Sequence, residues 1–320
     1  MRLPVRLGLQ LPSFELRGTP LDTLFPKLVE IAQTAERAGF DSLFVMDHLH
    51  QIPGVGPQEQ RMLEGNTALA ALAARTERLQ LGLMVGSVTY RNPALHAKIT
   101  TTLDVISGGR AIHSLGAGWF EDEHQAYGYE FPPLKERFER LEDALQIARA
   151  MFTQERGTVA GHHFRIDGAL NNPRPLRGDI PILVGGSGER KTLRLVAQHA
   201  DGCNIFGDPE RVRHLLDVLD SHCADVGRDP AEITRTRLGT LSIAETHEEA
   251  ERRLADWPDR ANLDPERLRN VLTLGDPDEV GEQIVALRET GLDGLVFHLP
   301  NPQELETVAL AGETVSRALG

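Results

Sequence analysis

The stretch PILVGGSGERKTLRLVAQHADGCNIFG, residues 181–207, contains one complete strand–helix–strand unit. The apolar run PILVGG (181–186) predicts a buried strand, and ERKTLRLVAQHA (189–200) carries apolar residues three and four positions apart, as an amphipathic helix does. DGCNIFG (201–207) then predicts the next strand. Two strands that are joined through a helix run parallel in one sheet. This stretch therefore predicts an α/β fold.

The same alternation continues in both directions along the chain. Strands are expected at 5–11, 42–46, 79–86, 110–116, 181–186, 201–207, 235–244 and 293–299. Helices are expected at 21–39, 67–75, 93–106, 137–152, 189–200, 209–227, 277–291 and 302–319. Eight parallel strands close a barrel, and no G-x-G-x-x-G follows the first strand to favour the alternative, an open doubly wound sheet. We predict a single (β/α)8 TIM-barrel domain over residues 1–320.

Two connections are longer than a single crossover needs. The segment 155–178, after the fourth predicted strand, is rich in turn residues and contains a short β-like piece, HHFRI. The segment 246–272, after the seventh predicted strand, is highly charged and has a helical pattern. We expect both segments to be insertions into the barrel.

The composition limits the classes of partner. The 320 residues include 34 Lys and Arg against 47 Asp and Glu, a net charge of −13, which argues against binding to nucleic acid or to an anionic membrane. Two cysteines are too few for a disulfide framework or a four-cysteine zinc site. No window approaches the roughly 18 apolar residues of a membrane span. We expect an unprocessed cytoplasmic protein that acts on a small molecule.

Functional groups of a TIM barrel lie after the C-terminal ends of its strands, where Gly185, Gly186, Ser187 and Gly188 form a candidate anion site. Bare backbone N–H groups and the start of a helix would face one point there, which suits a phosphate. Arg190 lies in the first helical turn, where a cation is otherwise disfavoured. The other interpretation is a tight turn that needs only the conformational freedom of glycine.

Asp47 and His48 follow the second predicted strand. Histidine titrates near neutral pH, so His48 is a candidate proton donor. The alternative is that the two residues form a structural pair. A metal site on His48 and His50 would need further ligands at other strand ends, and the fifth and sixth predicted strands end without one. We therefore predict no metal.

Trp119 is one of two tryptophans in the chain. It follows the fourth predicted strand and lies between glycines and the acidic run of residues 121–123. An aromatic side chain at the mouth of a barrel can form a wall for a flat ligand, whereas most tryptophans pack in the core. Both interpretations stay open for Trp119.

Several segments together resemble the luciferase-like flavin and deazaflavin oxidoreductases, in particular the branch that uses coenzyme F420. They include AERAGFDSLFVMDHL (35–49), VTYRNPAL (88–95) and GAGWFEDEHQAYGYEFPP (116–133), with further matches at 171–175, 182–209 and 226–233. The resemblance covers most of the chain. It implies a TIM barrel, a homodimer, and a deazaflavin that lies across the mouth of the barrel.

The resemblance also implies roles for individual residues. His48 meets the ring as the catalytic residue, together with Trp119 as a wall. Met84 and Val85 are expected to form a non-prolyl cis peptide that backs the ring. The residues expected to contact the cofactor are Asp47, Met84, Val85, Gly118, Gly185, Gly186, Ser187 and Gly188.

The resemblance leaves the substrate open. Relatives that oxidise a sugar phosphate have glutamate near position 119, where this chain has Trp119, so a sugar phosphate is not the expected substrate. We favour hydride transfer between F420 and a small organic molecule. The alternatives are an FMN-dependent monooxygenase that uses dioxygen and a partner reductase, and a non-redox barrel that acts on a phosphorylated metabolite.

Overall fold

The first and the last strand of the chain pair with each other in one parallel sheet. In the computed structural model, which describes residues 3–257 and 265–320, β1 (Leu7–Leu11) pairs with β2 (Ser42–Val45) on one side and with β12 (Gly294–His298) on the other. The strand order is β3–β2–β1–β12–β10–β9–β8–β5–β4. The remaining strands on this path are β3 (Gln80–Leu83), β4 (Gly86–Ser87), β5 (His113–Gly116), β8 (Ile182–Gly185), β9 (Gly202–Ile205) and β10 (Thr234–Ile243).

The sheet closes between β3 and β5. Leu81 forms an isolated parallel bridge with Ala111, where its N–H donates to the carbonyl of Arg110 at 2.9 Å and its carbonyl accepts from the N–H of Ile112 at 2.8 Å. The nearly closed barrel of parallel strands confirms the predicted (β/α)8 fold.

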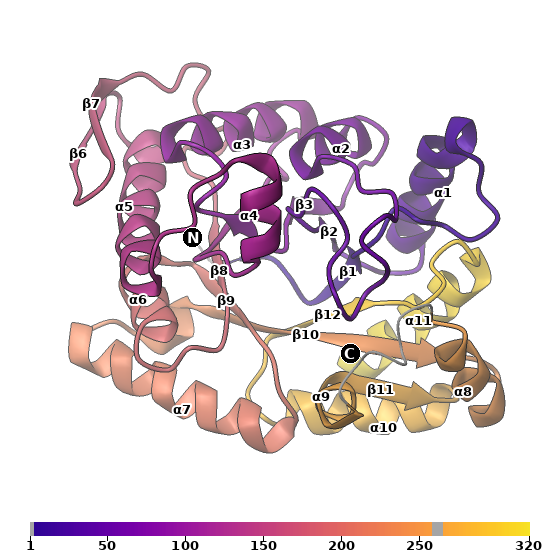
Figure 1. Ribbon diagram of the computed structural model, residues 1–320. Helices are drawn as coiled ribbons and strands as arrows, with labels where there is room; N and C mark the ends of the chain where they lie inside the picture. The colour runs from indigo at the N-terminus through magenta and orange to yellow at the C-terminus, as the bar shows by residue number, and fades with distance from the viewer. Residues whose placement is uncertain (1–2, 258–264) are drawn as a thin grey trace.

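A ring of helices surrounds the strands (Figure 1). These helices are α1 (Leu24–Arg37), α2 (Gly65–Ala73), α3 (Pro93–Ser107), α5 (Leu134–Thr153), α6 (Thr192–His199), α7 (Pro209–Val226), α10 (Pro277–Arg288) and α11 (Leu305–Leu319). In α3, Asn92 accepts from the N–H groups of residues 94 and 95, Pro93 takes the first helical position, and Gly108 ends the helix at φ 72°. No helix among the described residues is long and apolar enough to cross a membrane.

Apolar side chains fill both sides of the sheet. Phe44, Met84, Ile112, Leu183 and Val296 belong to a small cluster that is separate from the larger core of strand and helix side chains. Each fully buried side chain of this size contributes roughly 1.5–3 kcal/mol to folding. Both faces of the sheet are covered, which explains why the strands have continuous apolar sequences.

Some elements differ from the expected ones. The strand expected at 79–86 is divided into β3 and β4, and the Met84–Val85 peptide bond between them is cis. The segment after β5 contains an unexpected helix, α4 (Glu121–Tyr127), and a hairpin of β6 (Gly157–Ala160) and β7 (Arg165–Ala169). The helix expected at 189–200 begins only at Thr192.

The connection between β10 and β12 is only partly helical. It contains α8 (His247–Ala255), α9 (Pro265–Val271) and an extra strand, β11 (Leu272–Gly275), which pairs in parallel with β10. Residues 258–264 of the segment expected to be helical lie outside the described residues. The two predicted insertions and the single-domain organisation stay predictions.

Candidate active site

A cavity of about 340 Å³ lies at the C-terminal ends of the strands, a volume within the usual range for small-molecule sites. We call it the ring cavity. Its lining includes eight of the residues that the sequence predicts for the site: Asp47, His48, Met84, Val85, Gly118, Trp119, Gly185 and Gly186. Ser187 and Gly188 do not line it. The barrel thus brings together residues that lie far apart in the sequence.

Glu123 fixes the orientation of His48. The Nδ1 atom of His48 lies 2.8 Å from Oε2 of Glu123, whose side chain is fully buried. A carboxylate accepts hydrogen bonds, so Nδ1 carries the proton in this contact and the other ring nitrogen, Nε2, is the one that can exchange a proton in the neutral tautomer. This arrangement suits a proton carrier at the edge of the ring cavity.

The carboxylate of Glu123 has several other donors. The N–H of Leu49 and the hydroxyl of Tyr90 donate to it, and the N–H of His50 donates at 3.1 Å. Burial alone would raise the pKa of Glu123, but the hydrogen bonds from His48 and Tyr90 outweigh burial and lower the pKa to about 2. Glu123 is therefore ionised at neutral pH.

Asp47 pairs with Arg91 and not with His48. Nη1 and Nη2 of Arg91 donate to the two carboxylate oxygens at 2.7 and 2.8 Å, and the N–H of Ser87 donates at 2.7 Å. Burial raises the pKa of Asp47, while the guanidinium and the Ser87 N–H oppose this shift. Asp47 and His48 do not bind each other, because Asp47 pairs with Arg91 and His48 with Glu123.

Trp119 lies at the rim of the ring cavity. Its side chain is 58% exposed, so core packing does not explain it. The indole stacks on Phe120 at a centroid distance of 5.0 Å and contacts the imidazole of His48 edge-on at 5.6 Å. This position fits the interpretation of Trp119 as a wall for a flat ligand.

The loop between β5 and α4 is held by α5. Arg137 donates from Nη1 to the carbonyl of Gly118 and from Nε to the carbonyl of Pro132 at 3.0 Å. Gly118 has φ 76°, and a Cβ atom at this position would lie 2.9 Å from the hydroxyl of Ser87. Both the backbone angle and the close approach require glycine here.

The glycine turn after β8 differs in detail from the expected anion site. The N–H of Gly186 donates to the carbonyl of Asn204 at 2.9 Å, so it is already engaged within the protein. The hydroxyl of Ser187 accepts from the N–H of Phe206 at 3.0 Å. Thr192 is the first residue of α6, whose N-terminus has no side-chain cap, and it lines the ring cavity. The start of α6 therefore faces the cavity, as a phosphate site requires.

Glu123 and Tyr90 follow predicted strands, but no role was predicted for either residue from the sequence. Glu123 belongs to an acidic run that follows Trp119, and this run forms the first turn of α4. Because α4 has only seven residues, its periodicity is too short to separate the buried Glu123 from the exposed Glu121 and Asp122 by sequence alone.

Comparison with known proteins agrees with this fold. Residues 11–294 match the luciferase-like monooxygenase family. The chain is 29% identical to an F420-dependent glucose-6-phosphate dehydrogenase from Microbacterium testaceum, over 98% of this chain and 97% of that protein. It is 31% identical to an F420-dependent glucose-6-phosphate dehydrogenase from Intrasporangium calvum, over 87% of this chain and 90% of that protein.

A solved structure has the same fold. An F420-dependent secondary alcohol dehydrogenase, in complex with an F420–acetone adduct, superposes with a TM-score of 0.84 over the whole of both chains at 19% identity. At this identity the likeness concerns the fold. Together with the match over residues 11–294, it confirms the resemblance found in the sequence, and the chain belongs to the luciferase-like monooxygenase family.

Proposed function

We propose that this chain is a coenzyme F420-dependent oxidoreductase that transfers hydride between the deazaflavin and a small organic substrate. The proposal rests mainly on the contact between His48 and the buried carboxylate of Glu123, which holds the imidazole at the edge of the ring cavity. Two curated relatives that match most of this chain are named F420-dependent dehydrogenases, which supports F420 as the cofactor.

The residues of the ring cavity fit a flat ring with a phosphate-bearing tail. Met84, Val85, Leu134 and Phe138 offer apolar contacts, and Trp119 forms the rim. Thr192 and the start of α6 offer a site for an anion. When bound, F420 would supply a ring carbon that accepts or donates hydride.

The protein has three tasks in this reaction. The apolar walls hold the substrate carbon against the ring and exclude water. His48 holds or releases the proton of the substrate oxygen at Nε2, because Nδ1 is committed to Glu123. Glu123 is a positioning residue, since its carboxylate accepts from Nδ1 and fixes the orientation of the imidazole.

Measurements of cofactor binding and turnover distinguish two alternative functions from this one. An FMN-dependent monooxygenase would use the same ring cavity, but it would bind FMN and consume dioxygen. A non-redox enzyme would turn over a phosphorylated metabolite without either cofactor. The two relatives with F420 in their names favour the deazaflavin over both alternatives.

Substitution of His48 and Glu123 tests the assigned roles. His48→Asn should lower kcat by about 10²- to 10⁴-fold and change the Kd of F420 by less than about threefold, because a proton transfer is lost and not a binding contact. Equal kcat values for the variant and the wild type would contradict the role of His48.

Glu123→Gln is expected to have an intermediate effect. Glutamine retains an acceptor but loses the negative charge, so kcat should fall about 10- to 100-fold. An unchanged kcat in Glu123→Gln would contradict the positioning role of Glu123.

The sequence also predicts a homodimer and a cytoplasmic location, and both remain proposals. Light scattering on the purified protein measures the oligomeric state, and fractionation of the source cells measures the location. A monomeric mass at micromolar concentration would contradict the homodimer.

A further inference from the structure

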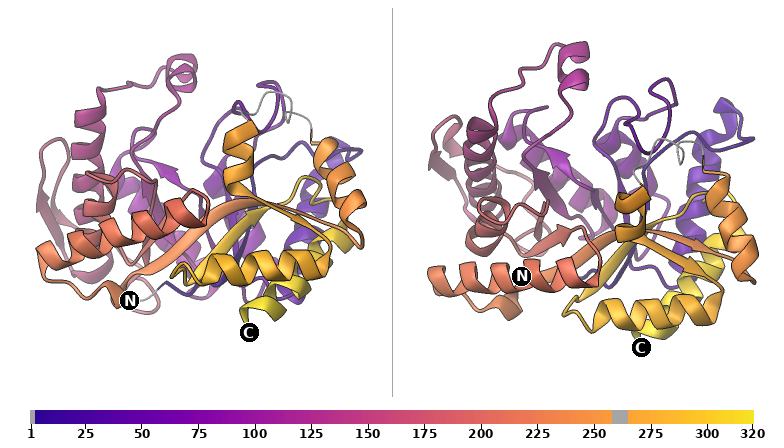
Figure 2. Two further views of the ribbon diagram at one scale, coloured as in Figure 1. Left: turned by 90° about the horizontal axis from the view of Figure 1, so that it is seen from below. Right: turned by 60° about the horizontal axis from the view of Figure 1, so that its bottom comes forward.

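Two hydroxyl groups connect the ring cavity to a buried histidine that the proposed function does not use. Ser87, in β4, lines the ring cavity, and its hydroxyl lies 2.7 Å from the hydroxyl of Thr89. The hydroxyl of Thr89 lies 2.6 Å from Nε2 of His124, a fully buried residue of α4 that does not line the cavity. Figure 2 shows α4 as the short magenta helix in the connection between β5 and α5. His124 can therefore act on the ring cavity through these two hydroxyl groups.

The other nitrogen of His124 decides where the ring carries its proton. Nδ1 lies 2.7 Å from the carbonyl oxygen of Phe120. A carbonyl oxygen can only accept, so Nδ1 is the protonated nitrogen. The rings of Tyr90 and Phe131 lie against the imidazole, each at a centroid distance of 4.8 Å. A second proton would place a buried cation against these uncharged groups, so Nε2 of His124 is an acceptor.

This acceptor sets the direction of both hydrogen bonds. A hydroxyl group has one proton to donate. Thr89 donates its proton to Nε2 of His124, so the oxygen of Thr89 accepts from Ser87. Ser87 thus donates its own proton to Thr89, and its oxygen has no further partner within the described part of the chain. What Ser87 offers to the ring cavity is an acceptor and not a donor.

The surroundings hold this acceptor in place. The N–H of Ser87 donates to the buried carboxylate of Asp47 at 2.7 Å, which fixes the backbone of β4. Gly118 leaves room beside the hydroxyl groups, because a Cβ atom at position 118 would lie 2.9 Å from that of Ser87 and 3.0 Å from that of Thr89. A hydrogen-bonding group that is ordered before the ligand arrives loses little conformational entropy on binding.

We propose that His124 is a positioning residue of the cofactor site, which acts through Thr89 to hold the hydroxyl of Ser87 as a hydrogen-bond acceptor toward the ring cavity. The inference rests on the proposed F420 dependence. The ring of a deazaflavin carries two kinds of donor, an N–H group and a hydroxyl group, and the oxygen of Ser87 binds one of them. A ring atom that can only accept finds no donor at this point, so the chain of hydrogen bonds restricts the orientation of the ring.

Substitutions at the two hydroxyl groups test this direction by fluorescence titration with F420. Ser87→Ala should raise the Kd at least about tenfold, because the ring donor loses its acceptor. Thr89→Val should raise the Kd at least about threefold, because the proton of Ser87 loses its acceptor and turns toward the ring donor. Thr89→Ser restores the hydroxyl group and should bind F420 as the wild type does. Thr102→Val, at an exposed position of α3, is the matched control and should leave the Kd unchanged.

Double variants separate the positioning role of His124 from a structural one. His124→Phe alone should raise the Kd at least about threefold, because Thr89 loses its acceptor and is free to donate to Ser87. In the Ser87→Ala background the same substitution should change the Kd by less than about twofold, since the hydroxyl that it orients is absent. An equal effect of His124→Phe with and without Ser87 would overturn the inference. So would an unchanged Kd in Thr89→Val together with a raised Kd in Ser87→Ala, because Ser87 would then donate to the ligand.

Methylated cofactors identify the donor on the ring. F420 methylated at the ring N–H and F420 methylated at the ring hydroxyl are titrated in parallel with F420. One of the two analogues should bind the wild type at least about tenfold more weakly than F420 does, and this difference should fall below about threefold in Ser87→Ala. Equal binding of both analogues and F420 to the wild type would overturn the inference. Absence of F420 binding to the wild type would instead contradict the proposed function.

Discussion

At the scale of single residues, the site depends on two acidic side chains with different partners. Asp47 pairs with Arg91 in two parallel hydrogen bonds, and Glu123 binds His48 and Tyr90. Each carboxylate is buried with its hydrogen-bond donors, so neither is left as an uncompensated charge. Glu123 is the acidic residue that orients His48, the proposed proton carrier.

The anion site can be tested at Ser187, whose backbone angle is not positive, whereas Gly186 has φ 128° and would be strained by any side chain. Ser187→Asp should raise the Kd of F420 at least about tenfold, because the new carboxylate repels the phosphate of the cofactor. Ser187→Asn is the matched uncharged control and should stay within about threefold of the wild type. Equal Kd values for Asp and Asn at this position would mean that no phosphate binds near it.

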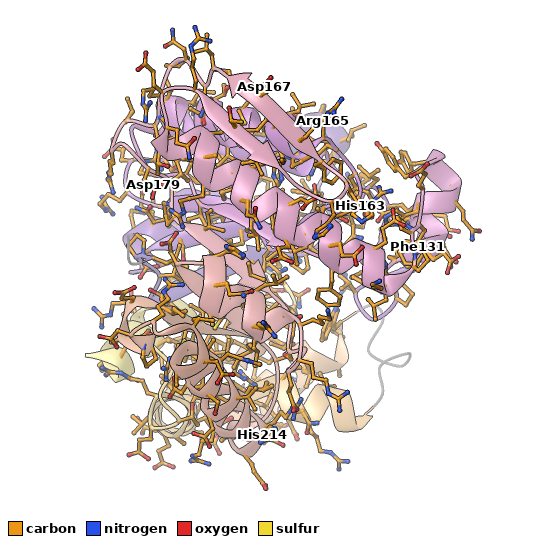
Figure 3. The ribbon with its side chains drawn as sticks, turned by 90° about the vertical axis from the view of Figure 1, so that its left-hand side faces the viewer. Phe131, His163, Arg165, Asp167, Asp179 and His214 are labelled. Atoms are coloured by element: carbon orange, nitrogen blue, oxygen red, sulfur yellow. The ribbon has the colours of Figure 1, made fainter. Side chains whose placement is uncertain are left out.

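At the scale of elements, one carboxylate ties the β6–β7 hairpin to α5. Asp143 in α5 accepts from the N–H groups of His162, His163 and Phe164 at 2.9, 2.7 and 3.0 Å. Figure 3 shows the hairpin lying along α5, with His163 and Arg165 labelled. None of these residues lines the ring cavity.

Removal of this carboxylate should therefore affect stability and not cofactor binding. Asp143→Ala should lower the free energy of unfolding by about 2–4 kcal/mol, because three N–H groups lose a charged acceptor. Denaturant unfolding measures the loss, and the Kd of F420 should change by less than about twofold. A large loss of F420 affinity in a folded variant would contradict this prediction, because it would show that the β6–β7 hairpin affects cofactor binding.

The sequence was sufficient to predict the helices and strands that have a strong periodic pattern. The βαβ unit at 181–207 and the alternation around it predicted the barrel, because buried parallel strands need continuous apolar runs. The two-residue strand β4 and the seven-residue helix α4 were missed because each is too short to establish a period. The strand β11 was missed because it adjoins the charged segment 246–272, which was predicted to be helical. Their positions are set by contacts with the barrel.

The same distinction applies to the site. Residues shortly after predicted strands, such as His48 and Gly118, could be predicted because the barrel places the C-terminal ends of all its strands on one side. The Arg91 partner of Asp47 and the Glu123 partner of His48 lie 44 and 75 positions away in the sequence. Such pairings depend on the tertiary structure, so no local pattern in one sequence indicates them.

At the scale of the whole molecule, two buried histidines should make stability depend on pH. The rings of His96 and His113 lie 4.6 Å apart in the interior. Burial lowers the pKa of His113 to about 3 and that of His96 well below its usual value. Both histidines are neutral in the folded protein, whereas the unfolded chain binds protons below about pH 6.5.

The free energy of unfolding should therefore fall as the pH decreases from about 6.5 towards 4.5. Each histidine contributes up to roughly 1.4 kcal/mol per pH unit in this range. Denaturant unfolding at a series of pH values measures the slope, and His113→Gln should make it shallower. His163→Gln, at a partly exposed surface position, is the matched control. Identical slopes for His113→Gln and the wild type would contradict this prediction.

The ring cavity is proposed to bind a deazaflavin. Fluorescence titration of the purified protein with F420 and with FMN, in parallel and under the same conditions, tests it most directly. We predict saturable binding of F420 at least about tenfold tighter than that of FMN, with His48→Asn binding F420 as the wild type does. Tight binding of FMN without detectable binding of F420 would contradict the claim and would favour the dioxygen-dependent monooxygenase.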